Sequence, residues 1–313
     1  MERAIIISNG RSGSTLLSDL IVEEPQTCSA QEYFMSLAPW NRSTELITGH
    51  EFWNVLSEPK EELSVLFRIG APPKEIRYPA HGRFAADLAS LPRILAVTLP
   101  ALTEDPDALF DSLAEPVKRF PAQRVGAHHR AFLDLLAEKT GKQRWVERSG
   151  GSSQITTSLL ENFPTAKFVY LTRDWAATAK SMSRHSSFQI VQLRLEAMAR
   201  YGVDPLTADP GDDVPAELAE FLPGRLTAET LRRRGDDQRL FLGLCAFMSS
   251  QADQALADHP PAQLHRMAYE QLVADPIGEL TTLGEFLGFA DPAAWAASVA
   301  GRVRTTSSMA VVA

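Results

Sequence analysis

The sequence has few cysteines, no long hydrophobic run and no excess of positive charge. Cys28 and Cys245 are its two cysteines, and no CxxC or Cys/His spacing typical of a zinc site accompanies them. Reduced thiols are therefore expected, as in cytosolic proteins. The apolar run that begins at Ala4 is shorter than the roughly 7–15 residues of a signal-peptide core, and no stretch reaches the roughly 20 residues of a membrane span. We expect a cytoplasmic protein without a membrane span.

The balance of charge disfavours one class of partner. The 313 residues include 39 acidic and 31 basic residues, and the net charge is −8. A protein that binds nucleic acid needs a basic footprint, so none is expected as a partner here. The 44% of hydrophobic residues supports a sizeable core. A local basic pocket for one anionic ligand remains compatible with this composition.

Strand and helix patterns alternate near the N-terminus and again from residue 143 on, and this alternation predicts an α/β fold. Continuous apolar runs are typical of strands that are covered on both faces of a parallel sheet. We expect strands at Ala4–Ser8, Gln143–Glu147, Lys167–Thr172 and Gln263–Met267, and helices at Ser14–Val22, Ser153–Asn162 and Trp175–Ser183, the last capped by Asp174. The chain is expected to form one domain, residues 1–313, with a P-loop-like central parallel sheet flanked by helices.

Two regions lack such clear patterns and are expected to cover a substrate site. Prolines interrupt short helical pieces in residues 35–140, and 203–224 looks like a surface insertion rich in Pro, Asp and Gly. We expect 35–140 and 184–230 to be variable and mostly helical, and to form the acceptor site. Further helices are expected at Ala131–Lys139, Ala228 to about Ala257, Glu279–Leu287 and Ala293–Val299.

The first strand is followed by a short loop that is suited to hold an anion. Small residues let backbone N–H groups turn around oxygen atoms, and the start of a helix favours negative charge. The loop differs from the nucleotide-kinase pattern GxxxxGK[ST], because the lysine before the hydroxyl residue is missing and the first glycine is misplaced. The candidate anion-binding residues are Gly10, Arg11, Ser12, Gly13, Ser14 and Thr15.

The loop and a later pair of residues resemble one enzyme family. Arg11-Ser12-Gly13-Ser14-Thr15 is similar to the 5′-phosphosulfate loop of bacterial-type sulfotransferases that use 3′-phosphoadenosine 5′-phosphosulfate (PAPS). Arg173 follows a predicted strand, and Ser181 lies eight residues later on the next helix. This spacing resembles the family's 3′-phosphate site, at the strand end where open α/β sheets bind ligands. The resemblance implies PAPS as co-substrate, the desulfated nucleotide (PAP) as product, and no metal.

The resemblance covers residues 3–34 and 143–190 and a piece near 263–290, and it becomes weaker elsewhere. Arg148-Ser149-Gly150 stands where many relatives have Lys-Thr-Pro, which leaves the role of Arg148 open. Many relatives also close the 3′-phosphate site with a late basic loop. Arg302 or Arg304 fits that role, with a solvated tail as the other interpretation.

The resemblance also offers a general base. Gln31-Glu32-Tyr33-Phe34 is similar to a segment of trehalose and lipopolysaccharide sulfotransferases whose glutamate is the proposed base, although Ala30 replaces a proline there. It implies Glu32 as the base and a carbohydrate or glycolipid hydroxyl as the acceptor. Histidines also titrate near neutral pH, so His128, His129 and His185 remain alternative bases, with His128 second to Glu32.

The leading hypothesis is thus a PAPS-dependent sulfotransferase that acts on a small-molecule or glycolipid hydroxyl acceptor by in-line transfer. One alternative is a Mg-ATP-dependent small-molecule kinase in which Asp174 would bind the metal. A second alternative is a degenerate nucleotide-binding protein. The sequence does not indicate an oligomeric state.

Overall fold

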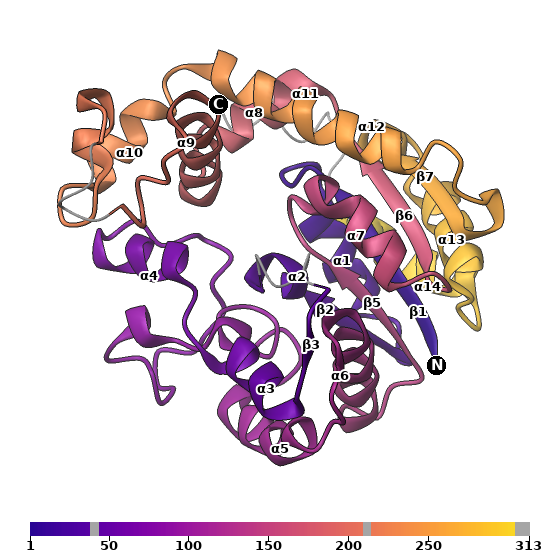
Figure 1. The fold of residues 1–313 in the computed structure, drawn as a ribbon. Coiled ribbons are helices and arrows are strands. Elements are labelled where there is room, and N and C mark those ends of the chain that lie inside the picture. The colour runs from indigo at the N-terminus through magenta and orange to yellow at the C-terminus, as the bar shows by residue number, and fades with distance from the viewer. Residues whose placement is uncertain (38–43, 209–213, 304–313) are drawn as a thin grey trace.

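The computed structural model describes residues 1–37, 44–208 and 214–303. The fold is α/β, with a five-stranded parallel sheet in the order β2-β5-β1-β6-β7 at its centre and helices on both faces (Figure 1). The strands are β1 (Glu2–Ser8), β2 (Thr27–Gln31), β5 (Arg144–Arg148), β6 (Lys167–Thr172) and β7 (Leu264–Ala268). The class predicted from the sequence is confirmed.

The central strands are buried on both faces, because alternate side chains enter two separate cores. Ile5 and Ile7 of β1 belong to one core, whereas Ala4 and Ile6 belong to the other. This is why β1 reads as a continuous apolar run. The first core contains residues of α6 (Val125–Lys139), α7 (Thr156–Asn162) and α11 (Gln238–Ala255), and the second contains residues of α1 (Ser14–Ile21), α12 (Tyr269–Ala274), α13 (Pro276–Leu287) and α14 (Pro292–Val299).

The predicted elements near the sheet are confirmed with small shifts at their ends, and two predictions are wrong. The helix expected from Ala228 to Ala257 is two helices, because Asp237 accepts a hydrogen bond from the Arg239 N–H and starts a new helix there. The helix expected from Ser153 begins instead as a 3-10 turn over Ser152–Ile155. Strand β2 was not predicted, because its sequence is polar.

The two regions without clear sequence patterns form the part of the molecule that faces the sheet (Figure 1). Residues 44–140 contain β3 (Leu46–Ile47), α3 (Gly49–Ser57), α4 (Glu61–Arg68), α5 (Pro106–Lys118) and β4 (Gln123–Arg124), after the short α2 (Tyr33–Ser36). The chain after β6 forms α8 (Trp175–Met182), α9 (Ser186–Tyr201) and α10 (Ala228–Arg234). Both regions thus consist mainly of helices joined by irregular segments.

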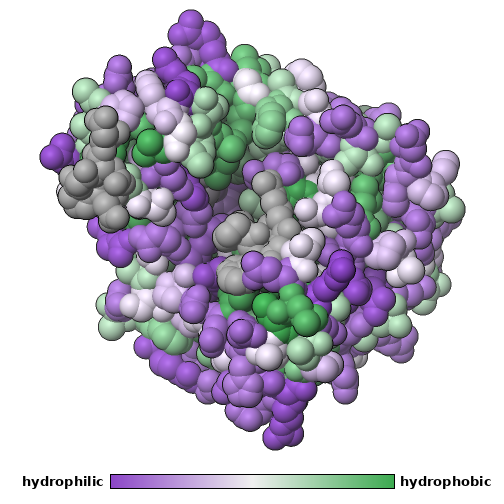
Figure 2. Space-filling view, viewed as in Figure 1, coloured by the Kyte–Doolittle hydropathy of each residue, from purple (hydrophilic) through white to green (hydrophobic). Residues whose placement is uncertain are grey.

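Helices α4, α9 and α10 form a helical arm that faces the sheet (Figure 1). Leu66, Ile190 and Leu231 pack in a core of their own with Leu218 and Phe221. The description of 203–224 as a surface insertion is therefore wrong for Leu218 and Phe221, which are buried in the arm. The surface is hollowed between the arm and the sheet (Figure 2). None of the described helices is long and apolar enough to cross a membrane.

Candidate active site

The candidate site lies where the carboxyl ends of all five strands meet. The loop from Asn9 to Gly13 follows β1, Glu32 follows β2, Gly150 closely follows β5, Arg173 follows β6 and Tyr269 follows β7. Since the strands are parallel, these residues share one edge of the sheet. The topology therefore gathers residues from across the sequence in one place.

The loop after β1 has a backbone that requires glycine at two positions. Gly10 and Gly13 have φ angles of 75° and 91°, in the left-handed region. A Cβ on Gly10 would lie 2.4 Å from the Phe188 ring, and one on Gly13 would lie 2.3 Å from the Tyr269 ring. Arg11 between them also has a positive φ, 56°, a conformation that is uncommon for a side-chain-bearing residue and is concentrated at functional sites.

The start of α1 has no capping side chain, so its first N–H groups are available to an anion. Gly13 caps the helix without a side-chain hydrogen bond, and the first turn carries no acidic residue. The Ser12 hydroxyl is buried and has no hydrogen-bond partner among the described residues. The positive end of the helix dipole thus points into the loop, as in phosphate-binding sites.

The two phosphate half-sites predicted from the sequence lie in direct contact. Nε of Arg11 donates to the Ser181 hydroxyl at 3.1 Å, and Nη1 of Arg173 donates to the Arg11 carbonyl at 3.1 Å. The Arg173 guanidinium also lies 4.5 Å from the centre of the Tyr269 ring. The chain folds so that residues 170 positions apart form one cationic corner.

This corner opens into a polar cavity, which we call the donor cavity. Lys74 and Arg77 lie on its wall, although no sequence pattern marked them. They come from an irregular segment after Pro72-Pro73, where neither periodicity nor a motif reveals the position of a side chain. The donor cavity is lined by Arg11, Gly13, Ser14, Thr15, Gln31, Lys74, Glu75, Arg77, Val97, Arg148, Arg173 and Ser181.

Glu75 places one carboxylate among these cations. Its Oε1 lies 2.5 Å from Nη1 of Arg11, and its Oε2 lies 2.7 Å from Nε2 of His185. Burial alone would raise the pKa of the Glu75 carboxyl. The hydrogen bond from His185 and the charges of His185 and Arg11 outweigh this effect and lower the pKa to about 2. The Glu75 side chain is thus a fixed negative charge beside the phosphate loop at neutral pH.

Glu32 has a strained backbone and lines a second cavity, which is described below. Its φ is 56°, and its N–H donates to the Arg148 carbonyl at 2.7 Å. The carboxylate accepts from the Gly150 N–H at 3.0 Å and forms an ion pair with the Arg148 guanidinium. The Glu32 side chain keeps 19% exposure, against 2% for Arg148. Glu32 is therefore oriented by its neighbours and remains partly exposed in this second cavity.

The buried Arg148 connects the ends of strands β5 and β2 with helix α1, which gives a position to a residue whose role the sequence left open. Its Nε and Nη2 donate to the Ser18 hydroxyl at 3.2 and 3.1 Å, and Nη2 also donates to Oε1 of Gln31 at 3.0 Å. Together with the ion pair to Glu32, these contacts give each nitrogen of the Arg148 guanidinium a hydrogen-bond partner. Arg148 therefore fixes α1 and the end of β2 relative to β5.

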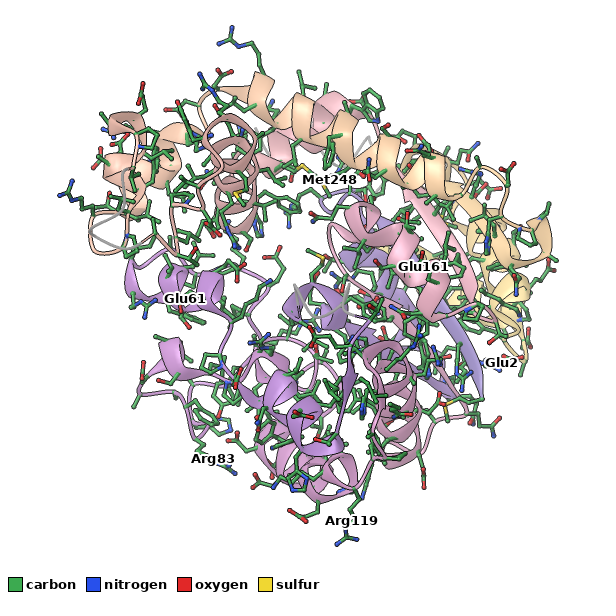
Figure 3. All side chains as sticks on the ribbon, viewed as in Figure 1. Glu2, Glu61, Arg83, Arg119, Glu161 and Met248 are labelled. Carbon is green, nitrogen blue, oxygen red and sulfur yellow. The ribbon has the colours of Figure 1, made fainter. Side chains whose placement is uncertain are left out.

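A second cavity adjoins the donor cavity, and we call it the acceptor cavity. Its empty volume is about 1040 Å³, including the open mouth. Side chains from the arm and from the ends of the strands line it, and Figure 3 shows side chains that reach into the space between these two parts. The two cavities share Arg11, Ser14, Thr15, Glu75, Val97 and Arg148.

The structure places His128 and His129 away from both cavities. His128 is fully buried, stacks on Phe52, and contacts the Ile47 carbonyl through Nε2 at 2.9 Å. His129 is also buried, and its Nδ1 lies 2.9 Å from the Tyr33 hydroxyl. Burial lowers the pKa of His128. The expectation that His128 acts as a base therefore does not fit its position, because the surrounding core separates it from the phosphate loop.

Arg302 likewise lies away from the donor cavity. It ends the turn after α14 and pairs with Glu23 at 2.7 Å. Glu23 follows the carboxyl end of α1, whereas the phosphate loop precedes the amino end. The expectation that Arg302 closes the 3′-phosphate site does not fit this position. Arg304 lies outside the described residues. Within residues 1–37, 44–208 and 214–303, no group of three or more His, Cys, Asp or Glu side chains is arranged to hold a metal ion.

Comparison with known proteins finds similarity at the level of structure. No protein-family model matches the sequence, and no curated protein matches it. A sulfotransferase domain from the curacin biosynthetic pathway matches over 92% of this chain and 73% of its own, at 17% identity and a TM-score of 0.45. A sulfotransferase from Mycobacterium avium matches over 96% and 68%, at 15% identity and 0.45. One from Mycobacterium tuberculosis H37Rv matches over 95% and 70%, at 16% identity and 0.43.

Proposed function

We propose that this protein transfers a sulfuryl group from PAPS to a hydroxyl acceptor. The observation that carries the proposal is the contact between Arg11, Arg173 and Ser181. These residues belong to two sequence motifs that resemble the two phosphate sites of one donor. They line one cavity beside the uncapped start of α1. A ligand with two separate phosphate groups explains why both sites occur together.

The residues of the donor cavity fit such a ligand. In the proposal, the N–H groups of residues 13–15 and the Arg11 guanidinium bind the 5′-phosphosulfate, while Arg173 and Ser181 bind the 3′-phosphate. Lys74 and Arg77 add positive charge to the wall of this cavity. Charge accumulates on the 5′-phosphate as the sulfur leaves it, so preorganised donors at that point lower the barrier.

The transfer itself needs a base and an in-line path. The acceptor oxygen forms a bond to sulfur, the bond between sulfur and the bridging phosphate oxygen breaks, and the acceptor proton passes to a base. Glu32 is the base in our proposal, because its carboxylate lines the acceptor cavity together with Arg11. His185 also lines this cavity, but its Nε2 is engaged by Glu75 and its Nδ1 is buried.

The similarity to trehalose and lipopolysaccharide sulfotransferases at residues 31–34 gives little support to a carbohydrate or glycolipid acceptor. Gln31, Tyr33 and Phe34 are buried, and only Glu32 of this segment faces the acceptor cavity. A segment that is mostly buried serves to orient the base and cannot form the surface that recognises a sugar. The proposal therefore keeps the hydroxyl as acceptor and bases the choice of its chemical class on the cavity wall.

One binding experiment separates the sulfotransferase from its alternatives. The affinities of the purified chain for PAP and for ATP are measured by calorimetry, with Mg²⁺ and with a chelator. Tight binding of PAP that does not change with Mg²⁺ is expected. A preference for ATP that requires Mg²⁺ would support the kinase instead. Binding of PAP without any transfer from PAPS to a broad panel of acceptors would leave the degenerate nucleotide-binding protein.

A further inference from the structure

Much of the wall of the acceptor cavity is apolar. The apolar side chains come from α2, α4, α9 and the irregular segment near residue 75. Among the described residues, Phe188 is the one Phe, Tyr or Trp that lines it, so the apolar part of the wall is mostly aliphatic. The principal apolar residues are Met35, Leu63, Leu66, Ile76, Phe188 and Val191.

The charged groups on the same wall are already bound within the protein. Glu62 forms an ion pair with Arg194, and Nζ of Lys60 donates to the Met35 carbonyl at 2.5 Å. Glu32 and Glu75 have the partners described above. A polyhydroxylated acceptor would lose water from each of its hydroxyls and find few free charged partners in exchange, which costs binding energy. A molecule with one hydroxyl loses much less.

The two cavities adjoin and share six lining residues, and this sets the orientation of an acceptor. Arg11, Glu75 and Arg148 line both cavities, and Glu32 is the ion partner of Arg148. A hydroxyl must be at this junction to reach both the sulfur and the base. The rest of the molecule then extends along the apolar wall toward Leu66 and Val191. Only an acceptor with an apolar body gains from this burial.

We infer that the acceptor is an alcohol with an apolar body, whose single hydroxyl lies near one end. This inference rests on the proposed function and adds to it the chemical class of the acceptor. It replaces the carbohydrate expected from residues 31–34. The hydroxyl is held at the junction by polar groups, and the hydrocarbon part provides the affinity.

A homologous series of primary alcohols tests the inference directly. With saturating PAPS, kcat/KM is measured for straight-chain alcohols from ethanol to octanol, and for glucose and trehalose. Each methylene that is buried should raise kcat/KM by about fourfold until the wall is filled. A series that is flat or falls with length, or higher kcat/KM for the sugars, would overturn the apolar acceptor.

A pair of isosteric variants checks that the effect arises in this cavity. Val191→Thr keeps the volume of the side chain and adds a hydroxyl to the wall. It should lower kcat/KM for the longest alcohol by about tenfold and change the value for ethanol by less than twofold. Val65→Thr is the control, because Val65 is also a partly buried helical valine but packs in the core of the arm. It should leave both values unchanged.

The outcomes also separate this inference from the proposed function. Affinity for PAP is measured for each variant and reports an intact donor site. If PAP binds and sulfate is transferred only to polyhydroxylated acceptors, or to no alcohol of the series, the acceptor class is wrong while the donor site stands. If PAP does not bind to the unsubstituted chain, the proposed function itself is wrong. Equal losses for Val191→Thr and Val65→Thr would also contradict the assigned cavity.

Discussion

The carboxylate of Glu75 binds the guanidinium of Arg11 in the phosphate loop, with 2.5 Å between Oε1 and Nη1. An acidic side chain thus holds the cation that the proposed function assigns to the 5′-phosphosulfate. The pKa of Glu75 is lowered to about 2, so the carboxylate is ionised at neutral pH. A donor that carries several negative charges must compete with it for Arg11 and is repelled by it.

Glu75→Gln should therefore strengthen the binding of PAP. The amide keeps the size of the side chain and removes the negative charge from the donor cavity. We expect affinity for PAP to rise about fivefold, which corresponds to about 1 kcal/mol for a partly exposed charge. Calorimetric titration at low and moderate salt measures the change, and the gain should shrink as salt screens the repulsion.

Glu62→Gln provides the matched control for this prediction. Glu62 is a carboxylate on the wall of the acceptor cavity, pairs with Arg194, and does not line the donor cavity. Its substitution should leave the affinity for PAP within twofold. Weaker binding of PAP by Glu75→Gln would show instead that the main effect of Glu75 is to hold Arg11 in its binding position.

Arg173→Ala should weaken the binding of PAP much more than the binding of adenosine 5′-phosphate. In the proposal Arg173 contacts the 3′-phosphate, which only PAP carries, and a charge-assisted hydrogen bond contributes about 2 kcal/mol. We expect a loss of about thirtyfold for PAP and less than threefold for adenosine 5′-phosphate. Equal losses for the two nucleotides would reject the assigned contact.

Arg302→Ala is the companion variant for Arg173→Ala. Its ion pair with Glu23 is exposed, so the free energy of unfolding should change by less than about 1 kcal/mol. Affinity for PAP should stay the same, because Arg302 does not line the donor cavity. A clear loss of PAP affinity would restore the original expectation that Arg302 closes the 3′-phosphate site.

The residues of the candidate phosphate site could be selected from the sequence because they belong to clear local patterns. The loop follows an apolar strand, and Arg173 and Ser181 keep a fixed spacing across the end of β6 and α8. Strand β2 could not be predicted, since its polar side chains are satisfied only in the fold. For example, the Thr27 hydroxyl donates to Glu24 at 2.5 Å, and the Ser29 hydroxyl donates to the Ser18 carbonyl at 3.2 Å.

The rest of the candidate site depends on tertiary contacts between distant segments. Lys74, Glu75 and Arg77 lie in a segment without periodicity, and only the packing of this segment against the loop brings them to the donor cavity. For His128, by contrast, the type of side chain suggested a role that its position in the fold does not support. His128 has a side chain that suits a base, but the helix α6 places it in the core, where it contacts the Ile47 carbonyl.

Glu32→Gln should abolish most turnover while it preserves donor binding. If Glu32 is the base, its loss should lower kcat by about 10²–10⁴-fold, the usual contribution of a positioned base. Affinity for PAP should stay within about twofold. The variant should also be less stable, by about 3 kcal/mol, because the buried Arg148 loses its charged partner. Chemical denaturation and single-turnover rates from PAPS measure the two effects separately.

His128→Asn is the control for the loss of Glu32. His128 is buried in the core and lines neither cavity, so its substitution should lower the free energy of unfolding by about 1–3 kcal/mol and leave kcat of the folded protein unchanged. Full turnover by Glu32→Gln at saturating acceptor would remove Glu32 as the base. A large loss of kcat in His128→Asn would return His128 to that role.

Glu147 provides a prediction about pH, because it is a carboxyl inside the core beside Glu32. Its Oε1 accepts from the Ser149 hydroxyl at 2.5 Å and from the Phe34 N–H at 3.2 Å, and its Oε2 has no hydrogen-bond partner among the described residues. Burial is the largest cause that raises the pKa of Glu147, to about 8, and the charge of Glu32 raises it further. The folded protein therefore keeps this proton at neutral pH.

The sign of the effect on stability follows from this raised pKa. Above about pH 4.5 the unfolded chain releases the Glu147 proton while the folded protein retains it, so stability falls as the pH rises toward 8. Glu147→Gln keeps the acceptor oxygen and cannot titrate. The free energy of unfolding of the variant minus that of the unsubstituted protein should therefore increase by about 3 kcal/mol from pH 5 to pH 8. Urea denaturation at each pH measures this difference. Glu115→Gln, at an exposed carboxyl, is the control, and its difference in unfolding free energy from the unsubstituted protein should not change comparably with pH. If the difference for Glu147→Gln stays constant with pH, the buried carboxyl is ionised in the folded protein.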